Sequence, residues 1–381
     1  MPSSRSDDVR VIVDGVTFDG FYDADVDSDF ETVADAFVVR GAPPSNPKLL
    51  SAFFEGNKVD VYVGDDRQMA GVIDDLHVRS NSSRDEIQIV GRDKGAYLVD
   101  NDAQTVGSLS GLTLEALANK LLLPSFGIRR VLLSNEANRK LLMGKKDRRS
   151  KAGTSKKRPL FSDAPRAETA VRPAQKIAQV LEERTRQLGV TFNITAEGDL
   201  FLGSPDYHQE VAFQFTCLGK DNPRRVYNNC EIELVRSMGD RASELTIVGQ
   251  GSASSTAVFG GRATTAAGAK FKATARDEDL MARRIVRRRS RVDGDVLNRQ
   301  QAQDRADYEA GLARMHGFTL RITTPDFRQG GRLFAVDTLA NVRFEAAGVE
   351  GVFWVAQRRF IESRGKRRTE LRLYPPGLWL P

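Results

Sequence analysis

The glycines of this chain suggest a phosphate-binding loop, but their spacing does not match one. The stretch 248–262 is rich in glycine, serine and alanine. Arg262 follows Gly261 where a phosphate-binding loop requires lysine, and Ser254 stands where a dinucleotide-binding turn requires its third glycine. We therefore interpret the wider segment 249–275, which has few large apolar groups, as a mobile loop.

The carboxylates likewise form no recognised site. Asp293 and Asp295 flank a glycine as in a calcium loop, but Asp304 occupies the position of that loop's bidentate glutamate. Asp295 is better explained as the N-cap of the helix that follows. No pair of carboxylates carries a glycosidase motif, although a hydrolase stays an alternative function.

The cysteines and histidines have no metal-binding spacing. The chain has 2 cysteines and 3 histidines, and Cys217 and Cys230 belong to no C-x-x-C unit. We interpret both cysteines as small hydrophobic side chains. The sequence therefore predicts no catalytic residue, no cofactor and no bound metal.

The positive charge of the chain is concentrated in two segments. Its formal net charge is +6, with basic residues gathered at 139–158 and again around Arg287, Arg288 and Arg289. Because neither segment contains aromatic residues that could stack on bases, solvated loops or contacts with an acidic protein are favoured. Nucleic-acid binding through phosphates is the alternative, and a steep salt dependence of binding would reveal it.

The apolar residues do not indicate a membrane protein. No apolar run approaches the roughly 20 residues that span a bilayer, and the polar start MPSSRSDDVR does not resemble a signal peptide. We expect a protein without a membrane anchor that folds in a cytoplasm.

Alternating apolar residues predict strands over most of the chain. Val59, Val61 and Val63 alternate with polar residues, and a glycine–aspartate turn follows them. Short strands with turns at this spacing, over 8–100, favour a barrel or a sandwich. The segment 318–375 has the same character.

Helices are expected in three places. Thr113 is a suitable N-cap for a helix that ends before Pro124. A second helix is expected from about Pro173 to Leu188, followed by a β-hairpin up to Leu202. The third helix, 296–316, carries alanines on one face that permit close approach of another element; these are Ala302, Ala306, Ala310 and Ala313.

The end of the first β region resembles the end of the chain. Val72-Ile73 corresponds to Trp354-Val355, and Ile89 corresponds to Leu371 at the same separation. This pattern predicts a duplication in which 8–100 forms one barrel, and 225–250 with 318–375 forms a second. A different strand order, or fusion into one continuous sheet, would count against duplication.

One segment resembles a known family. In IQIVGRDKGAYLVDNDA, Gly91, Arg92, Asp93 and Lys94 close a strand, and an L-V-D turn follows at 98–100. This resembles the first barrel of Mu-type phage baseplate hub proteins, which are related to late-control D proteins and VgrG-type spikes. The order of elements over roughly 8–375 is similar to that family as well.

The resemblance implies a virion structural protein without enzymatic activity. It implies a homotrimer that joins the six-fold tail tube to the three-fold central spike of a contractile tail, because two similar barrels in each of three chains give a six-fold-like ring. Tape measure and baseplate wedge proteins are further partners, and DNA would pass through the channel. A component of a related contractile injection system is the alternative.

The expected fold is mainly β with α+β inserts, containing two similar β-barrel domains and smaller helix-containing domains. The C-terminal residues Leu378, Trp379 and Leu380 are interface candidates, together with the three arginines at 287–289. The expected divisions are 1–103 (first barrel), 104–168 (helix-containing insert with the basic loop 139–158), 169–224 (helix and hairpin), 225–295 (start of the second barrel), 296–317 (helix) and 318–381 (completion of that barrel, and tail).

Overall fold

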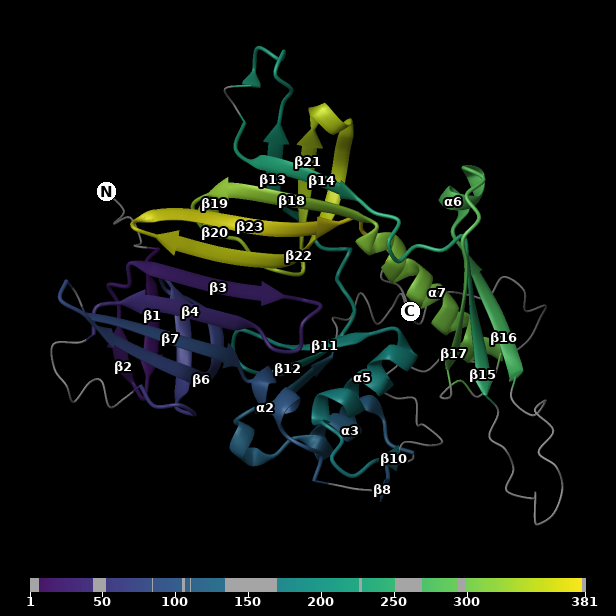
Figure 1. Cartoon of the computed structure of the whole chain (residues 1–381), viewed down its shortest axis with the longest axis horizontal. Helices are drawn as coiled ribbons and strands as arrows, with labels where there is room; N and C mark the ends of the chain where they lie inside the picture. The colour runs from purple at the N-terminus through teal and green to yellow at the C-terminus, as the bar shows by residue number, and fades with distance from the viewer. Residues whose placement is uncertain are drawn as a thin grey trace. The chain divides into compact units, whose positions relative to one another are not determined.

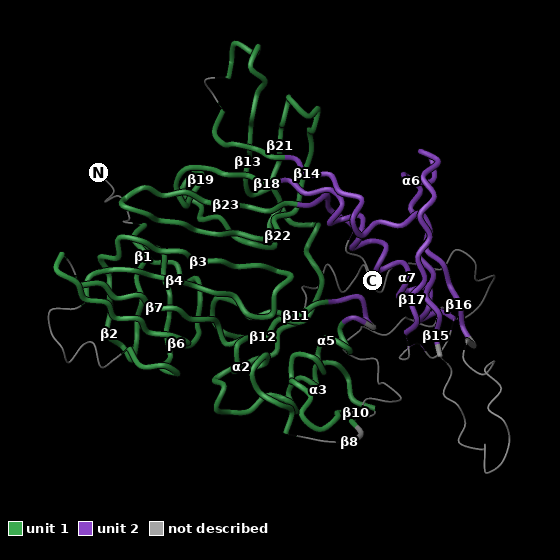
Figure 2. Tube along the Cα trace, viewed as in Figure 1, with its two compact units in different colours: residues 1–185, 191–233, 321–373 green, residues 186–190, 234–320, 374–381 purple. Residues whose placement is uncertain are grey.

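The computed structural model has two compact units (Figure 2). Unit 1 consists of residues 1–185, 191–233 and 321–373, and unit 2 of residues 186–190, 234–320 and 374–381. The structure describes residues 7–43, 53–83, 85–104, 107–109, 111–133, 170–225, 228–250, 269–293, 296 and 299–378. The basic loop 139–158, Asp295, Trp379 and Leu380, and most of the predicted loop 249–275, lie outside these residues.

A 13-stranded sheet dominates the chain (Figure 1). Its strands from the N-terminal region are β1 (Val9–Val13), β2 (Val16–Phe18), β3 (Asp23–Asp29), β4 (Ala36–Gly41), β5 (Lys58–Val63), β6 (Asp66–Ser80) and β7 (Asp85–Asp93). Its later strands are β13 (Val211–Cys217), β14 (Glu231–Arg236), β18 (Phe318–Pro325), β21 (Thr338–Phe344), β22 (Val349–Ser363) and β23 (Lys366–Tyr374). The small strands β19 (Arg328–Gln329) and β20 (Arg332–Leu333) form a separate hairpin, and the 3₁₀ turn η3 (Glu345–Ala347) joins β21 to β22.

The predicted period-2 strands are present and bury the expected residues. Val59, Val61 and Val63 of β5 are almost fully buried, while the residues between them are partly exposed. Val9, Val11 and Val13 of β1 are buried in the same way and pair with β5. The apolar face of each strand thus forms the core, because successive side chains point to opposite faces.

The two β regions have the same strand order. In the N-terminal region the neighbours run β3-β4-β7-β6-β5-β1, and in the C-terminal region they run β14-β18-β23-β22-β21-β13. Each strand of the first series corresponds to one of the second in both position and chain order. One detail differs: β1 is antiparallel to β5, whereas β13 is parallel to β21.

The two β regions are joined into one sheet. Strand β22 pairs antiparallel with β3, from Gln357 opposite Asp29 to Ser363 opposite Asp23, so that yellow and purple strands lie side by side in Figure 1. The expectation of two separate closed barrels is therefore not confirmed. The continuous sheet counts against the predicted duplication, whereas the shared strand order favours it. The sequence pattern could not predict the pairing of β22 with β3, because the alternation of apolar and polar residues does not depend on which strand edges form hydrogen bonds.

An insert of helices and short strands lies between the β regions in the sequence. Its elements are α2 (Gly95–Asp100), β8 (Gly107–Ser108), α3 (Leu114–Leu121), η1 (Pro124–Phe126), β9 (Val131–Leu133), β10 (Ala170–Val171), α5 (Ile177–Leu188), β11 (Thr191–Ile194) and β12 (Leu200–Gly203). Thr113 caps α3 as predicted, because its hydroxyl accepts from Ala116 N at 3.1 Å. The hairpin β11–β12 is also confirmed, and β9 adds to it in parallel. Helix α5 begins later than expected, after Ala174 with a φ of 59°.

Unit 2 contains a small three-stranded sheet covered by a helix. Its elements are β15 (Glu244–Gln250), β16 (Ala269–Arg276), α6 (Glu278–Ala282), β17 (Arg288–Asp293) and α7 (Arg299–His316), with β15 as the central strand. The alanine face of α7 packs on this sheet, where Ala302 and Ala306 are fully buried with Ile247. The small side chains thus allow close helix–sheet contact, as the alanine spacing predicted. Strand β15 belongs here and not to the second β region, which differs from the expected division 225–295.

Candidate functional site

The junction of β3 and β22 has a charged rim. Arg359 on β22 donates to both carboxylate oxygens of Asp25 on β3, with Nε–Oδ1 at 2.8 Å and Nη2–Oδ2 at 2.5 Å. Gln357 donates to both carboxylate oxygens of Asp27 at 3.0 Å. These contacts match an acidic strand to a strand with basic and amide side chains, and they fix the register of the junction.

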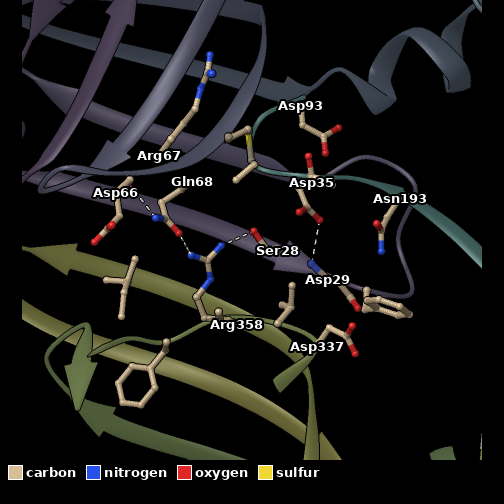
Figure 3. Close-up of a pocket in the computed structure, with 18 of the residues that line it drawn as sticks. Ser28, Asp29, Asp35, Asp66, Arg67, Gln68, Asp93, Asn193, Asp337 and Arg358 are labelled. Carbon is tan, nitrogen blue, oxygen red and sulfur yellow. Dashed lines mark hydrogen bonds between the residues drawn. The ribbon is translucent and has the colours of Figure 1, made fainter. Parts of the chain in front are cut away.

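At the centre of the junction lies a buried arginine (Figure 3). Arg358 is 3% exposed and donates to the Ser28 hydroxyl of β3 and to Oε1 of Gln68 on β6. Its guanidinium also lies over the Phe360 ring, 4.2 Å from the centroid. Burial lowers the pKa of Arg358 to about 10, and the nearby carboxylates of Asp35 and Asp27 oppose this shift. One side chain therefore links three strands from both β regions.

Two buried aspartates accompany Arg358 in the N-terminal region. Asp35 accepts a hydrogen bond from Asp29 N at 2.8 Å, and burial raises its pKa to about 7. The pKa of Asp93 is raised well above its ordinary value, first by burial and then by the negative charge of Asp35. The Asp93 carboxylate accepts from Gly95 N at 2.7 Å and so supports the start of α2.

A third raised carboxyl group comes from the C-terminal region. Asp337 accepts from Trp354 Nε1 at 2.9 Å and from Asp206 N at 3.0 Å through the same oxygen, Oδ1. Burial raises its pKa to about 6. Trp354 is fully buried and packs edge-on against Phe30, which follows β3. Asp337 thus fixes an indole ring that packs against the other β region.

These side chains line a cavity of about 640 Å³ in unit 1. A carboxyl group with a raised pKa can serve as a general acid or base, but a buried ion network can have a purely structural role. Here Arg358 bonds directly across the junction, and Asp337 holds Trp354 against Phe30, so these contacts fix the position of one β region on the other. Within the described ranges, no group of three or more His, Cys, Asp or Glu side chains could hold a metal ion.

The G-R-D-K segment, which carries the sequence resemblance, joins the N-terminal β region to the insert. Arg92 donates to Asp74 of β6 at 2.7 Å and to Asp100 at 2.7 Å. Residues 98–100, predicted as a turn, form the end of helix α2 instead. Lys94 donates to the carbonyl oxygen of Gly127 at 2.6 Å, in the insert. The backbone at Gly91 leaves no room for a side chain, because an added Cβ would lie 2.5 Å from Phe37. Each residue of the segment therefore has a structural contact.

The three arginines predicted as interface residues contact a loop and strand β15 in unit 2. Arg287 and Arg289 both donate to the Gly239 carbonyl oxygen at 2.8 Å, and Arg288 pairs with Glu244 at 2.9 Å. Leu378 lies against helix α7. A Cβ atom added to Gly311 of α7 would be 2.5 Å from the carbonyl oxygen of Leu378. No partner chain is present, so their role at an interface stays a prediction.

Sequence analysis missed the buried network around Arg358. A usable signal was present, because Trp354, Ala356 and Phe360 alternate as buried residues and Arg358 falls on the same face of β22. Asp35 had no such signal, because it lies between strands.

In the described part of the chain, no helix has the length and apolar character needed to cross a bilayer.

Two family models match the chain, one near each end. Residues 8–93 match the N-terminal domain of the Mu phage baseplate assembly protein GpP-like family. Residues 313–377 match a tail protein C-terminal domain. The search of curated proteins returned no match.

Solved structures share the fold over nearly the whole chain. A tail protein from Neisseria meningitidis matches with a TM-score of 0.76 and 23% identity, over 98% of this chain and 97% of that one. The 43 kDa tail protein of prophage MuSo2 from Shewanella oneidensis gives 0.74 and 18% identity, over 98% and 100%. An Escherichia coli type VI secretion component gives 0.53 and 8% identity, over 96% and 76%.

The two ends of the chain thus match domains of phage baseplate and tail proteins, and the whole chain shares its fold with solved tail proteins. The predicted family resemblance is therefore confirmed.

Proposed function

We propose that this protein is the structural hub of a contractile tail baseplate. It would assemble as a homotrimer that joins the six-fold tail tube to the three-fold central spike. The observation that supports this proposal most directly is the repeated strand order β3-β4-β7-β6-β5-β1 and β14-β18-β23-β22-β21-β13. Two similar edges in each of three chains present six near-equivalent positions to a hexameric tube.

The buried junction suits such a role better than it suits catalysis. Arg358 on β22 donates to Ser28 of β3 and to Gln68 of β6, and Trp354, which donates to Asp337, packs against Phe30, so that one β region is held on the other. A hub that transmits force between tube and spike needs this rigidity. We therefore propose a non-enzymatic protein in the virion tail baseplate, assembled in the host cytoplasm.

The partners follow from the proposed position. The tube protein and the central spike are direct partners, tape measure and wedge proteins are neighbours, and DNA passes through the channel of the ring. One structural neighbour is a VgrG protein solved in complex with PdpA from Francisella, with a TM-score of 0.53 and 6% identity. A hub or spike component of a related injection system is thus the second candidate.

Electron microscopy of the particle that carries the protein tests the proposal. Immunogold label against the chain should appear only at the baseplate end of the tail, and class averages of the purified protein should show three-fold particles. Label along the tube, or on the head, would overturn the proposal. Clearing of peptidoglycan by the purified chain would favour a hydrolase, and steeply salt-dependent DNA binding would favour a nucleic-acid role.

A further inference from the structure

The two longest strands of the sheet, β6 and β22, are used differently. Each has 15 residues, and each pairs through its first half with the preceding strand, β5 or β21. The second half of β22, 357–363, pairs with β3 on the edge that β21 leaves open. The corresponding half of β6 begins at residue 74, where its pairing with β5 has ended.

The second half of β6 has a free edge. Residues 75–80 pair with β7 on one side, and among the described strands none pairs with them on the other. Their side chains are mostly exposed, and Val78 is 51% exposed although it lies within a strand. Unpaired backbone groups along such an edge are a template for another strand.

The strand that corresponds to β3 also has a free edge. Strand β14 occupies the same place in the C-terminal series as β3 does in the N-terminal series, next to β18, which corresponds to β4. It ends the row of strands, and none of the described strands pairs with its second edge, although Asn229 and Cys230, directly before it, donate to the Thr216 carbonyl oxygen of β13. Like the acidic β3, it carries outward carboxylates, on Glu231 and Glu233, both of which are exposed.

We propose that β14 of one copy pairs antiparallel with the second half of β6 in the next copy, repeating the β3–β22 junction between chains. Six strands separate β14 from β6 in the row, so the pairing requires a second copy. The partner is therefore another molecule of this chain. This pairing supplies the contact for the proposed self-assembly. It rests on the proposed function only for the number of copies in the assembly.

The charges on the two edges favour the antiparallel direction. In that direction Glu231 and Glu233, at the start of β14, face His77 and Arg79 at the end of β6. In the register that places Glu231 opposite Arg79 and Glu233 opposite His77, Arg236 at the end of β14 faces Asp74, which also pairs with Arg92. A parallel pairing would place carboxylates opposite carboxylates, which is destabilising. The observed β3–β22 pairing is antiparallel and also matches an acidic strand to basic residues.

The contact joins different surfaces on the two copies, so it is head-to-tail. Such contacts generate closed rings or open filaments, whereas a two-fold contact would use the same edge twice. Each copy then offers one β14 edge and one β6 edge. This asymmetry makes the contact testable by cross-linking.

Cysteine pairs placed on the two edges test the inference in the full-length protein. The double variant H77C/E233C should form a ladder of covalent multimers on copper-catalysed oxidation, with E231C replacing E233C if the register differs by two residues. Each single variant, which keeps the native Cys217 and Cys230, should form no ladder. A mixture of the two single variants should give covalent dimers only. Each chain then carries one introduced cysteine, and a single cross-link consumes it.

A charge exchange provides the second measurement. Arg79→Glu and Glu231→Arg should each weaken self-association about tenfold by analytical ultracentrifugation, and the double variant should recover most of it. An oligomer without the cross-link ladder would overturn the strand pairing and leave the hub proposal standing. A protein that stays monomeric at every concentration would overturn both the pairing and the proposed homotrimer, whereas immunogold label away from the baseplate would overturn the hub proposal alone.

Discussion

The N-terminal and C-terminal β regions share a strand order but differ in what their long strands contact. The second half of β22 carries the buried Arg358 and Phe360 and is paired with β3 of the same chain. The second half of β6 carries exposed polar residues and Val78. The comparison shows that the same strand order can provide a junction within the chain in one β region and an open edge in the other. The residues of a single half-strand make this difference.

The largest effect should come from removing the buried cation of the junction. Arg358→Met deletes the donors to Ser28 and Gln68 and leaves the Asp35 carboxylate without its nearby positive charge, which should cost about 2–4 kcal/mol of unfolding free energy at pH 8. Urea denaturation followed by circular dichroism would measure it. The matched control is Val78→Ala on the half-strand of β6, expected within about 0.5 kcal/mol for the monomer. Equal effects in both variants would mean that the junction does not depend on its buried network.

A smaller, pH-dependent effect should come from Asp337. Its pKa is raised from 3.8 to about 6, so the folded state holds the proton more tightly than the unfolded state does. Stability contributed by the protonated form is complete below pH 3.8 and is lost as the pH rises through about 6. Asp337→Asn keeps the acceptor for Trp354 and avoids the buried charge, so it should stabilise the protein by about 1–3 kcal/mol at pH 8.

The advantage of Asp337→Asn should shrink steadily as the pH is lowered from 7.5 to 4.5, in thermal unfolding measured at several pH values. An advantage that is the same at every pH would show that the pKa of Asp337 is not raised in the folded protein.

The smallest effect should come from the rim of the junction. Arg359→Ala removes the ion pair with Asp25, but both side chains are partly exposed, so the expected loss is about 0.2–1 kcal/mol. The loss should fall further in 1 M salt, because solvent-exposed charges are screened. A double-mutant cycle with Asp25→Ala measures the pair itself. A coupling above about 2 kcal/mol would mean that the rim, and not Arg358, holds the junction.

Much of the local structure could be predicted from the sequence. The alternating valines of β5, the Thr113 cap of α3 and the alanine face of α7 each carry a local signal, and each is confirmed. The similarity between the ends of the two β regions also corresponds to real strands, since β6 and β22 have equal lengths, as do β7 and β23.

The long-range arrangement could not be predicted in the same way. The pairing of β3 with β22 depends on edges that are far apart in the sequence, and period-2 patterns do not specify which edges meet. Strand β15 has an ordinary strand pattern, so nothing in it indicated that it pairs with β16 and β17 in unit 2. The pKa shifts of Asp35 and Asp93 arise from burial between elements, which a linear sequence does not record.

The acidic strand β3 has a consequence for folding during synthesis. Its partner β22 is made some 330 residues later, so the edge of β3 stays open on the ribosome until almost the whole chain has emerged. Open strand edges at this stage invite pairing between nascent chains. The four aspartates of β3, at positions 23, 25, 27 and 29, repel a second copy of the same strand. The charges that match Arg359 in the folded protein therefore also protect the unfinished chain from aggregation.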